Sequence, residues 1–176
     1  IVDSLSVSGA QALLVMKAAD LMNENKTAEE IVAELEKFVP QVHTILILED
    51  IKWVEASGRI SHFAATLVRG MAKAGIRPVM ALKNGVLAPT GLKTGAKNIP
   101  TAIFKQFEHD AKDLIGEGKK IRLAIAHGDD PTGANRLKEM IENNFKNVEV
   151  VFVNILNNVV GVLAGPNVIV AAWCQA

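Results

Sequence analysis

The chain has one cysteine, Cys174, among its 176 residues, so it cannot form a disulfide within itself. Proteins in a reducing compartment need no disulfides, and we therefore expect a cytoplasmic location. No group near Cys174 in the sequence would lower the pKa of its thiol. We interpret this cysteine as a buried apolar residue rather than a nucleophile.

The chain also lacks an excess of charge of either sign. Its 19 Lys and Arg residues balance its 19 Asp and Glu residues, which gives a formal net charge of +0. This balance argues against a nucleic acid as partner. No apolar run is long enough to span a bilayer and no signal peptide is visible, so we expect no stable membrane insertion. The hydrophobic content of 49% is typical of a globular protein.

Internal repeats, low-complexity segments and cofactor motifs are missing as well. Gly91 and Gly95 belong to what we predict to be a flexible, basic loop at 91–97, but the Gly-Lys-Ser/Thr ending of a phosphate-binding loop is absent. We assign no cofactor, no metal and no catalytic residue. The chain begins with Ile1 rather than methionine, and we interpret it as the C-terminal portion of a longer protein.

The apolar residues predict strands and helices in alternation, which is typical of an α/β fold. Thr27 and Glu30 form a capping box that predicts a helix start. Pro100 and Pro131 each suit the first turn of a helix. We expect strands at residues 1–5, 44–48, 120–126, 148–155, 159–163 and 168–173, and further helices at 11–22, before Gly58 and after Ser61.

A hairpin is predicted at Asn84-Gly85, the preferred dipeptide of a type I′ turn. On the strand before it, Val79 and Ala81 share one face, while Met80 and Leu82 share the other. Because both faces are apolar, we expect at least one of them to line something other than water.

The corner at residues 55–63 holds the clearest candidate for an anion site. Gly58 suits the end of one helix, and Ser61 suits the N-cap of the next. Arg59 lies between the two, where free N–H groups and a guanidinium favour a carboxylate or a phosphate. The alternative is that Arg59 pairs with a nearby carboxylate or a helix C-terminus.

His127 follows a predicted strand and has two possible roles. It could be a phosphoryl acceptor or a base, or it could be a loop histidine that bonds to the backbone. No partner triad is apparent, which favours the second role.

Several short segments match one protein family in the same order and at similar spacing. They are residues 2–5, 58–61, 77–79 leading into Asn84-Gly85, 125–129 and 160–166. Together they resemble the DegV family of bacterial fatty-acid-binding proteins, whose members have two α/β domains with the ligand between them. The resemblance implies a layered α/β domain with a mixed sheet and an Asn-Gly hairpin at residues 43–176. Residues 1–42 would be the end of a first, truncated α/β domain.

The resemblance also implies a function. A long-chain fatty acid would lie in an apolar tunnel, and its carboxylate would be presented to a separate fatty acid kinase. The chain departs from the family pattern at several points. Leu163 stands where the family commonly has histidine, Ala10 and Ala12 replace glycines, and a basic loop is reduced to Lys93, Thr94 and Gly95.

We therefore predict a ligand site with an apolar part and a polar part. The acyl chain is expected to touch Phe63, Leu67, Val79, Val160 and Val162. The head group is expected near Arg59, Ser61, Lys93, Leu163, Gly165 and Pro166. Two other functions are weighed against this one. The chain could be a small-molecule phosphotransfer enzyme that uses His127, or an interaction module that binds no ligand.

Overall fold

The computed structural model describes residues 1–73, 76–94 and 98–176, without the side chains of residues 72, 77 and 92–94. Six strands form one sheet: β1 (His43–Ile47), β2 (Ile76–Lys83), β3 (Val86–Thr94), β4 (Ile121–His127), β5 (Val148–Ile155) and β6 (Ile169–Gln175). The helices are α1 (Gly9–Asn23), α2 (Ala28–Phe38), the 3₁₀ turn η1 (Val39–Gln41), α3 (Lys52–Ala56), α4 (His62–Lys73), α5 (Ile99–Asp110), α6 (Lys112–Gly116), α7 (Pro131–Asn144) and α8 (Asn158–Ala164).

The sheet is mixed, as the sequence predicts. Its strand order is β3-β2-β1-β6-β4-β5. Among the residues that the structure describes, only β4 and β5 pair in parallel, and the chain between them forms the crossover helix α7. Every other neighbouring pair is antiparallel.

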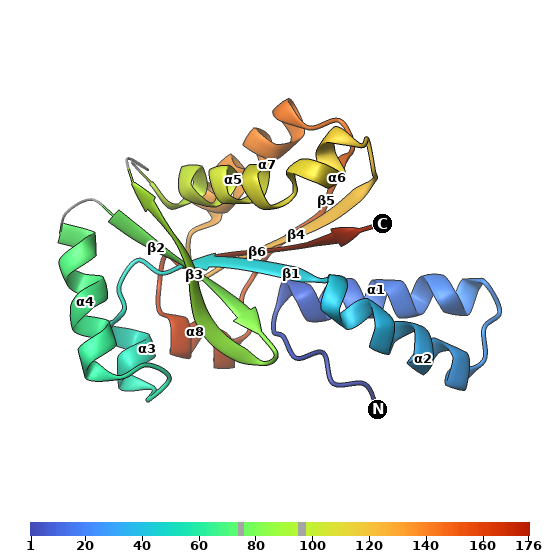
Figure 1. Cartoon of the computed structure of the whole chain (residues 1–176), viewed down its shortest axis with the longest axis horizontal. Helices are drawn as coiled ribbons and strands as arrows, with labels where there is room; N and C mark the ends of the chain where they lie inside the picture. Colours follow the sequence, from blue (N-terminus) through green and yellow to red (C-terminus); the bar gives the residue numbers. More distant parts are fainter. Residues whose placement is uncertain (74–75, 95–97) are drawn as a thin grey trace.

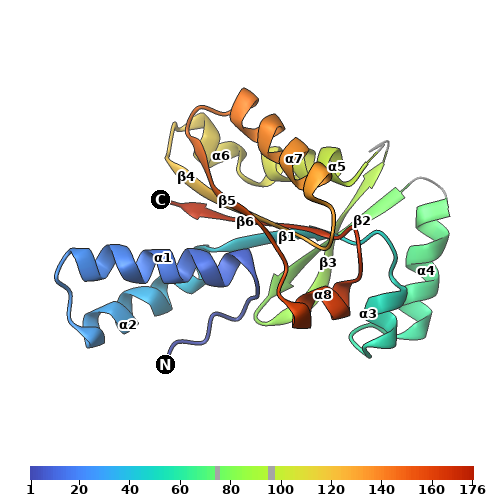
Figure 2. The same ribbon diagram turned by 180° about the vertical axis from the view of Figure 1, so that it is seen from behind.

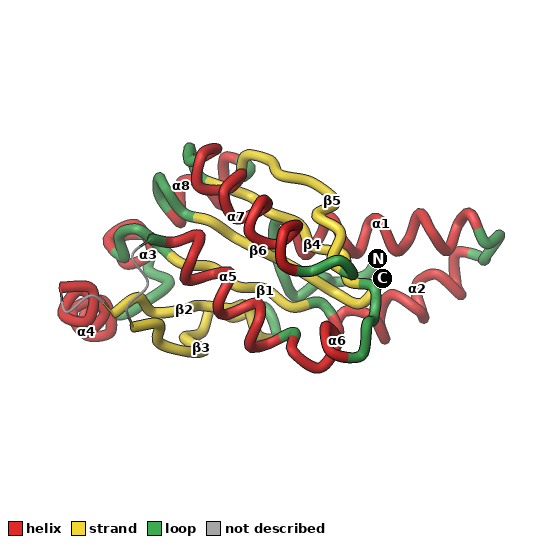
Figure 3. The backbone as a smooth tube through the Cα atoms, turned by 90° about the horizontal axis from the view of Figure 1, so that it is seen from above, coloured by secondary structure: helices red, strands yellow, loops and turns green. Residues whose placement is uncertain are grey.

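Helices cover both faces of this sheet (Figures 1 and 2). The helices α5, α6 and α7 lie on one face, where Figure 3 shows them over the strands, and the remaining helices lie on the other. Consecutive residues of β6 divide between the two faces. Ala171 and Trp173 pack under α5 and α7, whereas Ala172 and Cys174 pack against α1.

The helices α1 and α2 pack on the sheet that follows them in the chain. Ala10, Leu13 and Phe38 form one apolar cluster with Ala124 of β4 and with Ala172. A Cβ atom added at Gly9 would lie 3.1 Å from the Cβ atom of Ala124, so α1 approaches the sheet closely at its first residue. The division into two domains after residue 42 stays a prediction.

The short-range signals of the sequence act where they were expected. The side chain of Thr27 accepts from the N–H of Glu30, while Glu30 accepts from the N–H of Thr27. The turn between β2 and β3 places Asn84 and Gly85 at φ values of 50° and 77°. Such caps and turns depend on neighbours in the chain, which is why the sequence predicts them.

Three predicted elements are wrong. Residues 1–5 form no strand, because Leu5 has a φ of 48° and its carbonyl accepts from Gly85 N–H at 3.0 Å. Residues 91–94 belong to β3 rather than to a loop, while residues 95–97 lie outside the described part. Residues 159–163 belong to α8, because the sheet has no place for another strand beside β6. Both edges of β6 are occupied, by β1 and by β4.

Candidate functional site

The corner between α3 and α4 is built largely as the sequence predicts. Gly58 ends α3 at a φ of 72°, and the N–H of Arg59 returns to the carbonyl of Val54 at 3.2 Å. The Oγ of Ser61 accepts from the N–H of Ala64 at 3.3 Å and caps α4. Asp50 accepts from the N–H of Lys52 at 2.9 Å, just before α3. The backbone of the corner is therefore well determined on both sides of Arg59.

A carboxylate ties the two helices of this corner together. Glu55 of α3 accepts from His62 at the start of α4 and from Arg69 two turns further along the same helix. These hydrogen bonds lower the pKa of Glu55, with the bond from His62 as the larger cause. The arrangement fixes the angle at which α4 leaves α3.

Beside this corner lies the α3–α4 cavity, which encloses about 350 Å³ between α3, α4 and β2. Its apolar walls come from α4, from β2 and from the segment that precedes α3. They are Leu48, Ile51, Val68, Pro78 and Met80. Met80 and Ile51 are buried, so the floor is fixed by the core of the molecule. A cavity of this kind suits an apolar ligand group.

Charged side chains surround the mouth of the α3–α4 cavity. Lys52, Arg69 and Lys73 supply three cations, and Glu49 and Asp50 supply two carboxylates. Lys52 pairs with Asp50 at 3.3 Å, and Arg69 pairs with Glu55. Lys73 has no ion-pair partner among the residues that the structure describes. A ligand carboxylate could therefore bind Lys73 without competing with a protein carboxylate.

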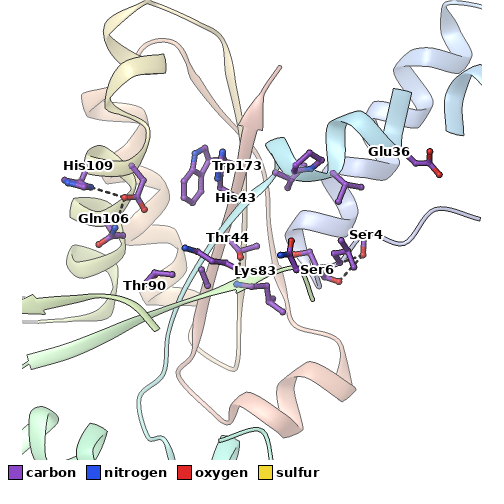
Figure 4. Close-up of a pocket in the computed structure, with 18 of the residues that line it drawn as sticks. Ser4, Ser6, Glu36, His43, Thr44, Lys83, Thr90, Gln106, His109 and Trp173 are labelled. Carbon is purple, nitrogen blue, oxygen red and sulfur yellow. Dashed lines mark hydrogen bonds and ion pairs between the residues drawn. The ribbon is translucent and has the colours of Figure 1, made fainter. Parts of the chain in front are cut away.

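A second and larger hollow, the β-fork groove, encloses about 820 Å³ where β1 and β2 separate (Figure 4). The two strands pair at Leu46 and Met80, whereas β1 pairs with β6 along its whole length. Beyond that point the side chain of Thr44 accepts from the N–H of Leu82 at 3.0 Å. The groove is thus a gap in the sheet that the hairpin tip and residues 4–6 border.

Many polar side chains line the β-fork groove beside apolar ones. His43 stacks on Trp173 with ring centroids 5.2 Å apart, and Asp110 accepts from Gln106 at 2.7 Å and pairs with His109 (Figure 4). Desolvation lowers the pKa of His43, although Asp110 acts in the opposite direction. The indole N–H of Trp173, which is 2% exposed, has no partner among the described residues. Such a lining suits polar groups rather than an acyl chain.

The five residues predicted to touch an acyl chain do not form one surface. Phe63 and Leu67 are 74% and 54% exposed on the outer side of α4, and Val162 is 73% exposed on α8. Val160 is half-buried and packs in the cluster that contains Met80. Val79 is fully buried in the cluster beneath α5, on the other face of the sheet. None of the five therefore lines the α3–α4 cavity, although Val160 shares a cluster with Met80, which does.

The residues predicted for the head group are also dispersed. Arg59 is exposed and has no ion-pair partner in the described part of the chain, so the alternative of a structural ion pair has no support there. Lys93 lies in β3 opposite Arg77, but its side chain is outside the described residues. Leu163 is half-buried, Gly165 ends α8, and Pro166 is exposed.

The two residues considered for covalent chemistry are held in unreactive settings. His127 is buried, and its Nδ1 accepts from the N–H of Asp130 at 3.2 Å, which is the backbone role favoured by the sequence. Burial raises the pKa of Cys174 to about 11, so its thiol stays protonated near neutral pH.

Sequence reasoning missed most of the α3–α4 cavity. It assigned Phe63 and Leu67 of α4 to the acyl chain, whereas the inward face carries Ala65 and Val68. The i, i+3 spacing of Ala65 and Val68 was the available signal. It was weaker than the alternative because alanine adds little to an apolar pattern.

Two negative findings hold for the residues that the structure describes. None of their helices is long and apolar enough to cross a membrane. Within the same residues, no cluster of three or more His, Cys, Asp or Glu side chains could hold a metal ion.

Comparison with known proteins relates this arrangement to one family. A family model described as "Uncharacterised protein, DegV family" matches residues 1–176. A curated relative from Thermotoga maritima, named "Fatty acid-binding protein", is 24% identical over 171 residues, which are 96% of this chain and 57% of the relative.

Solved structures agree in fold. A DegV family protein from Thermus thermophilus, described by its fatty acid binding, has a TM-score of 0.80 and 24% identity. One from Eubacterium eligens, loaded with heptadecanoic acid, has a TM-score of 0.79 and 20% identity. Each match covers 99% of this chain and 60% of the other. The chain thus spans little more than half the length of these proteins.

Proposed function

Since the chain belongs to the DegV family, we propose that it binds a long-chain fatty acid and that the acyl chain enters the α3–α4 cavity. The proposal describes a binding protein rather than an enzyme. We also propose that it acts in the cytoplasm, because its single cysteine is buried and reduced.

The observation that carries this proposal is the pairing of an apolar floor with a cationic mouth. Leu48, Val68 and Met80 offer apolar contact, while Lys73 offers an ammonium group that has no ion-pair partner within the described residues. A fatty acid has the same two parts in the same order, an apolar chain and a terminal carboxylate. Burying each methylene contributes about 0.8 kcal/mol, so the chain supplies most of the affinity and the ammonium sets the direction of binding.

The relatives support the class of ligand. The Eubacterium eligens protein was loaded with heptadecanoic acid, and the Thermotoga maritima relative is named for fatty acid binding. Both are less than one-third identical to this chain, so the identity of its own ligand rests on the chemistry of the cavity.

Native mass spectrometry tests the proposal. The chain purified from cells should retain a species with the mass of a long-chain fatty acid. After the lipid is removed, added heptadecanoic acid should bind with a stoichiometry of about one, as expected for a single apolar cavity of this size. If the delipidated chain gains no mass from heptadecanoic acid, the proposed function is wrong.

We further propose that the loaded protein presents the carboxylate to a fatty acid kinase. This step rests on the family resemblance and on the open position of the cavity mouth. Leu163, near Gly165 at the end of α8, offers apolar area where a histidine could donate a hydrogen bond. Acyl-phosphate formation with a kinase should therefore be faster for Leu163→His than for wild type at saturating fatty acid. Equal rates would remove position 163 from the reacting region.

A further inference from the structure

Trp53 of α3 packs directly against the backbone of Gly165, the residue that ends α8. A Cβ atom at position 165 would overlap Cδ1 of the indole and would lie 2.6 Å from Cγ and from Nε1. Gly165 also has a φ of 83°, which a glycine adopts without strain. Glycine at 165 thus serves two purposes, because it permits both the turn and the approach of the ring.

The ammonium group of Lys52 in turn lies over the indole ring of Trp53. The Nζ of Lys52 lies 5.2 Å from the centroid of the indole ring, and it lies 3.3 Å from Oδ2 of Asp50. Hydrogen bonds from the backbone and from Lys52 lower the pKa of Asp50, so this carboxylate stays ionised and helps to hold the ammonium. A lysine side chain is otherwise flexible, and fixing it costs conformational entropy. Contact with an aromatic face and a carboxylate restricts Lys52 before any ligand arrives.

Lys52 also lines the α3–α4 cavity. A continuous path of contacts therefore runs from Gly165 of α8 through the Trp53 ring to an ammonium group at the cavity mouth. Trp53 is 39% exposed, so part of its ring faces solvent. An ammonium group has three N–H donors, so Lys52 can bind a second carboxylate while it keeps Asp50.

We propose that Trp53 is a positioning residue for an anionic head group, because it is fixed by Gly165 and orients Lys52 toward the mouth of the α3–α4 cavity. The inference rests on the proposed fatty-acid function and adds to it the residues that select a carboxylate. Trp53 acts through Lys52, so its removal weakens recognition of charge and leaves recognition of the acyl chain intact.

Two ligands with the same chain separate these effects, namely oleic acid and oleyl alcohol. Their affinities for the delipidated chain are measured at pH 8 by displacement of a fluorescent fatty-acid probe, and the acid-to-alcohol ratio is compared among variants. Trp53→Leu should lower this ratio about threefold, the size of an exposed cation–π contact. Lys52→Met should lower it about tenfold, as expected for a charge-assisted hydrogen bond. Trp53→Phe, which keeps an aromatic face, should retain most of the wild-type ratio.

Lys17 provides a matched control at the other end of the molecule. Its Nζ lies 5.6 Å from the ring centroid of Phe38, so Lys17→Met removes a similar contact away from the cavity and should leave the ratio unchanged. Gly165→Ala displaces the Trp53 ring without altering Trp53 or Lys52. It should lower the ratio as Trp53→Leu does, which supplies a second test if the tryptophan variants fold poorly.

The outcomes distinguish this inference from the function on which it rests. Equal losses of affinity for acid and alcohol in Trp53→Leu would show a merely structural role and overturn the inference alone. An unchanged ratio in both Trp53→Leu and Gly165→Ala would do the same. If wild type binds neither ligand, the proposed function is wrong and the inference falls with it.

Discussion

The β-fork groove encloses about 820 Å³ and the α3–α4 cavity about 350 Å³, and the two regions also differ in their linings. The groove is a gap between diverging strands, and polar side chains such as Thr44 and Gln106 border it. The cavity has a buried apolar floor that includes Met80 and Ile51. An acyl chain gains affinity only where it leaves water for apolar surface, so the smaller region is the better site.

Filling the smaller cavity with a large side chain tests most directly which region holds the acyl chain. Val68→Trp places a large side chain into the space between α4 and β2. It should reduce the affinity for heptadecanoic acid at least about tenfold, because fewer methylenes can then be buried. Isothermal titration calorimetry measures the affinity. Thr90→Trp makes a similar change at the β-fork groove and should leave the affinity unchanged. A larger loss in Thr90→Trp than in Val68→Trp would assign the acyl chain to the groove.

The cations of the two regions offer a second contrast. Lys73→Met removes an ammonium at the cavity mouth that has no ion-pair partner in the part of the chain that the structure describes, and it should weaken heptadecanoic acid binding about tenfold. Lys112→Met removes an exposed ammonium beside the groove and should have no effect on that affinity. Calorimetry on the same ligand compares the two. Similar affinities for wild type and Lys73→Met would exclude Lys73 from the head-group site.

Arg59→Ala, measured alongside, should leave the melting temperature nearly unchanged, since an exposed arginine contributes little to stability.

Substitution of Ser61 distinguishes a structural role from a ligand-binding role for this residue of the α3–α4 corner. The structure uses its Oγ as the cap of α4. Ser61→Ala should therefore lower the free energy of unfolding by about 1 kcal/mol, as measured by urea denaturation. Its affinity for heptadecanoic acid should stay close to that of wild type. A stable variant with impaired binding would show the reverse, namely that Ser61 contacts the ligand.

Substitutions on the exposed face of α4 test the prediction that Phe63 and Leu67 touch the acyl chain. Phe63→Ser together with Leu67→Ser removes two apolar side chains that lie outside the cavity. The free energy of unfolding should change by no more than about 0.5 kcal/mol for each, and the affinity should be unchanged. A marked drop in affinity would indicate that Phe63 and Leu67, rather than the residues that line the cavity, contact the ligand.

The smallest expected effect is a difference in pH response. The folded-state pKa of His43 is lowered, so folding opposes its protonation, and the free energy of unfolding should fall as the pH drops below about 6.5. Glu55, near the cavity, also has a lowered pKa, and its stabilising contribution is present above about pH 4.5 and is lost only at lower pH. Urea denaturation at pH 7.5 and pH 5.5 should thus show a decrease for wild type that is smaller in His43→Gln. An identical decrease in that variant would assign the effect to another group.

Much of the fold was predictable from short stretches of sequence. The capping box at Thr27, the Asn84-Gly85 turn, the glycine at 58 and the cap at Ser61 all act as expected. So does His127, whose bond to the backbone lies within its own loop. In each case the partners are separated by only a few residues, and local chemistry is enough to choose the conformation.

The site depended on contacts that local patterns do not contain. Val159 and Val162 favour a strand by type, but β1 and β4 occupy both edges of β6, and those residues form α8 instead. Val79 and Met80 are neighbours in the chain, yet they lie in two cores on opposite faces of the sheet. Trp53 meets Gly165 across more than half of the sequence. The sequence by itself determined the class of fold, the caps and the turns, whereas the tertiary structure decided which apolar residues are buried. Burial depends on what packs against a side chain from distant parts of the chain.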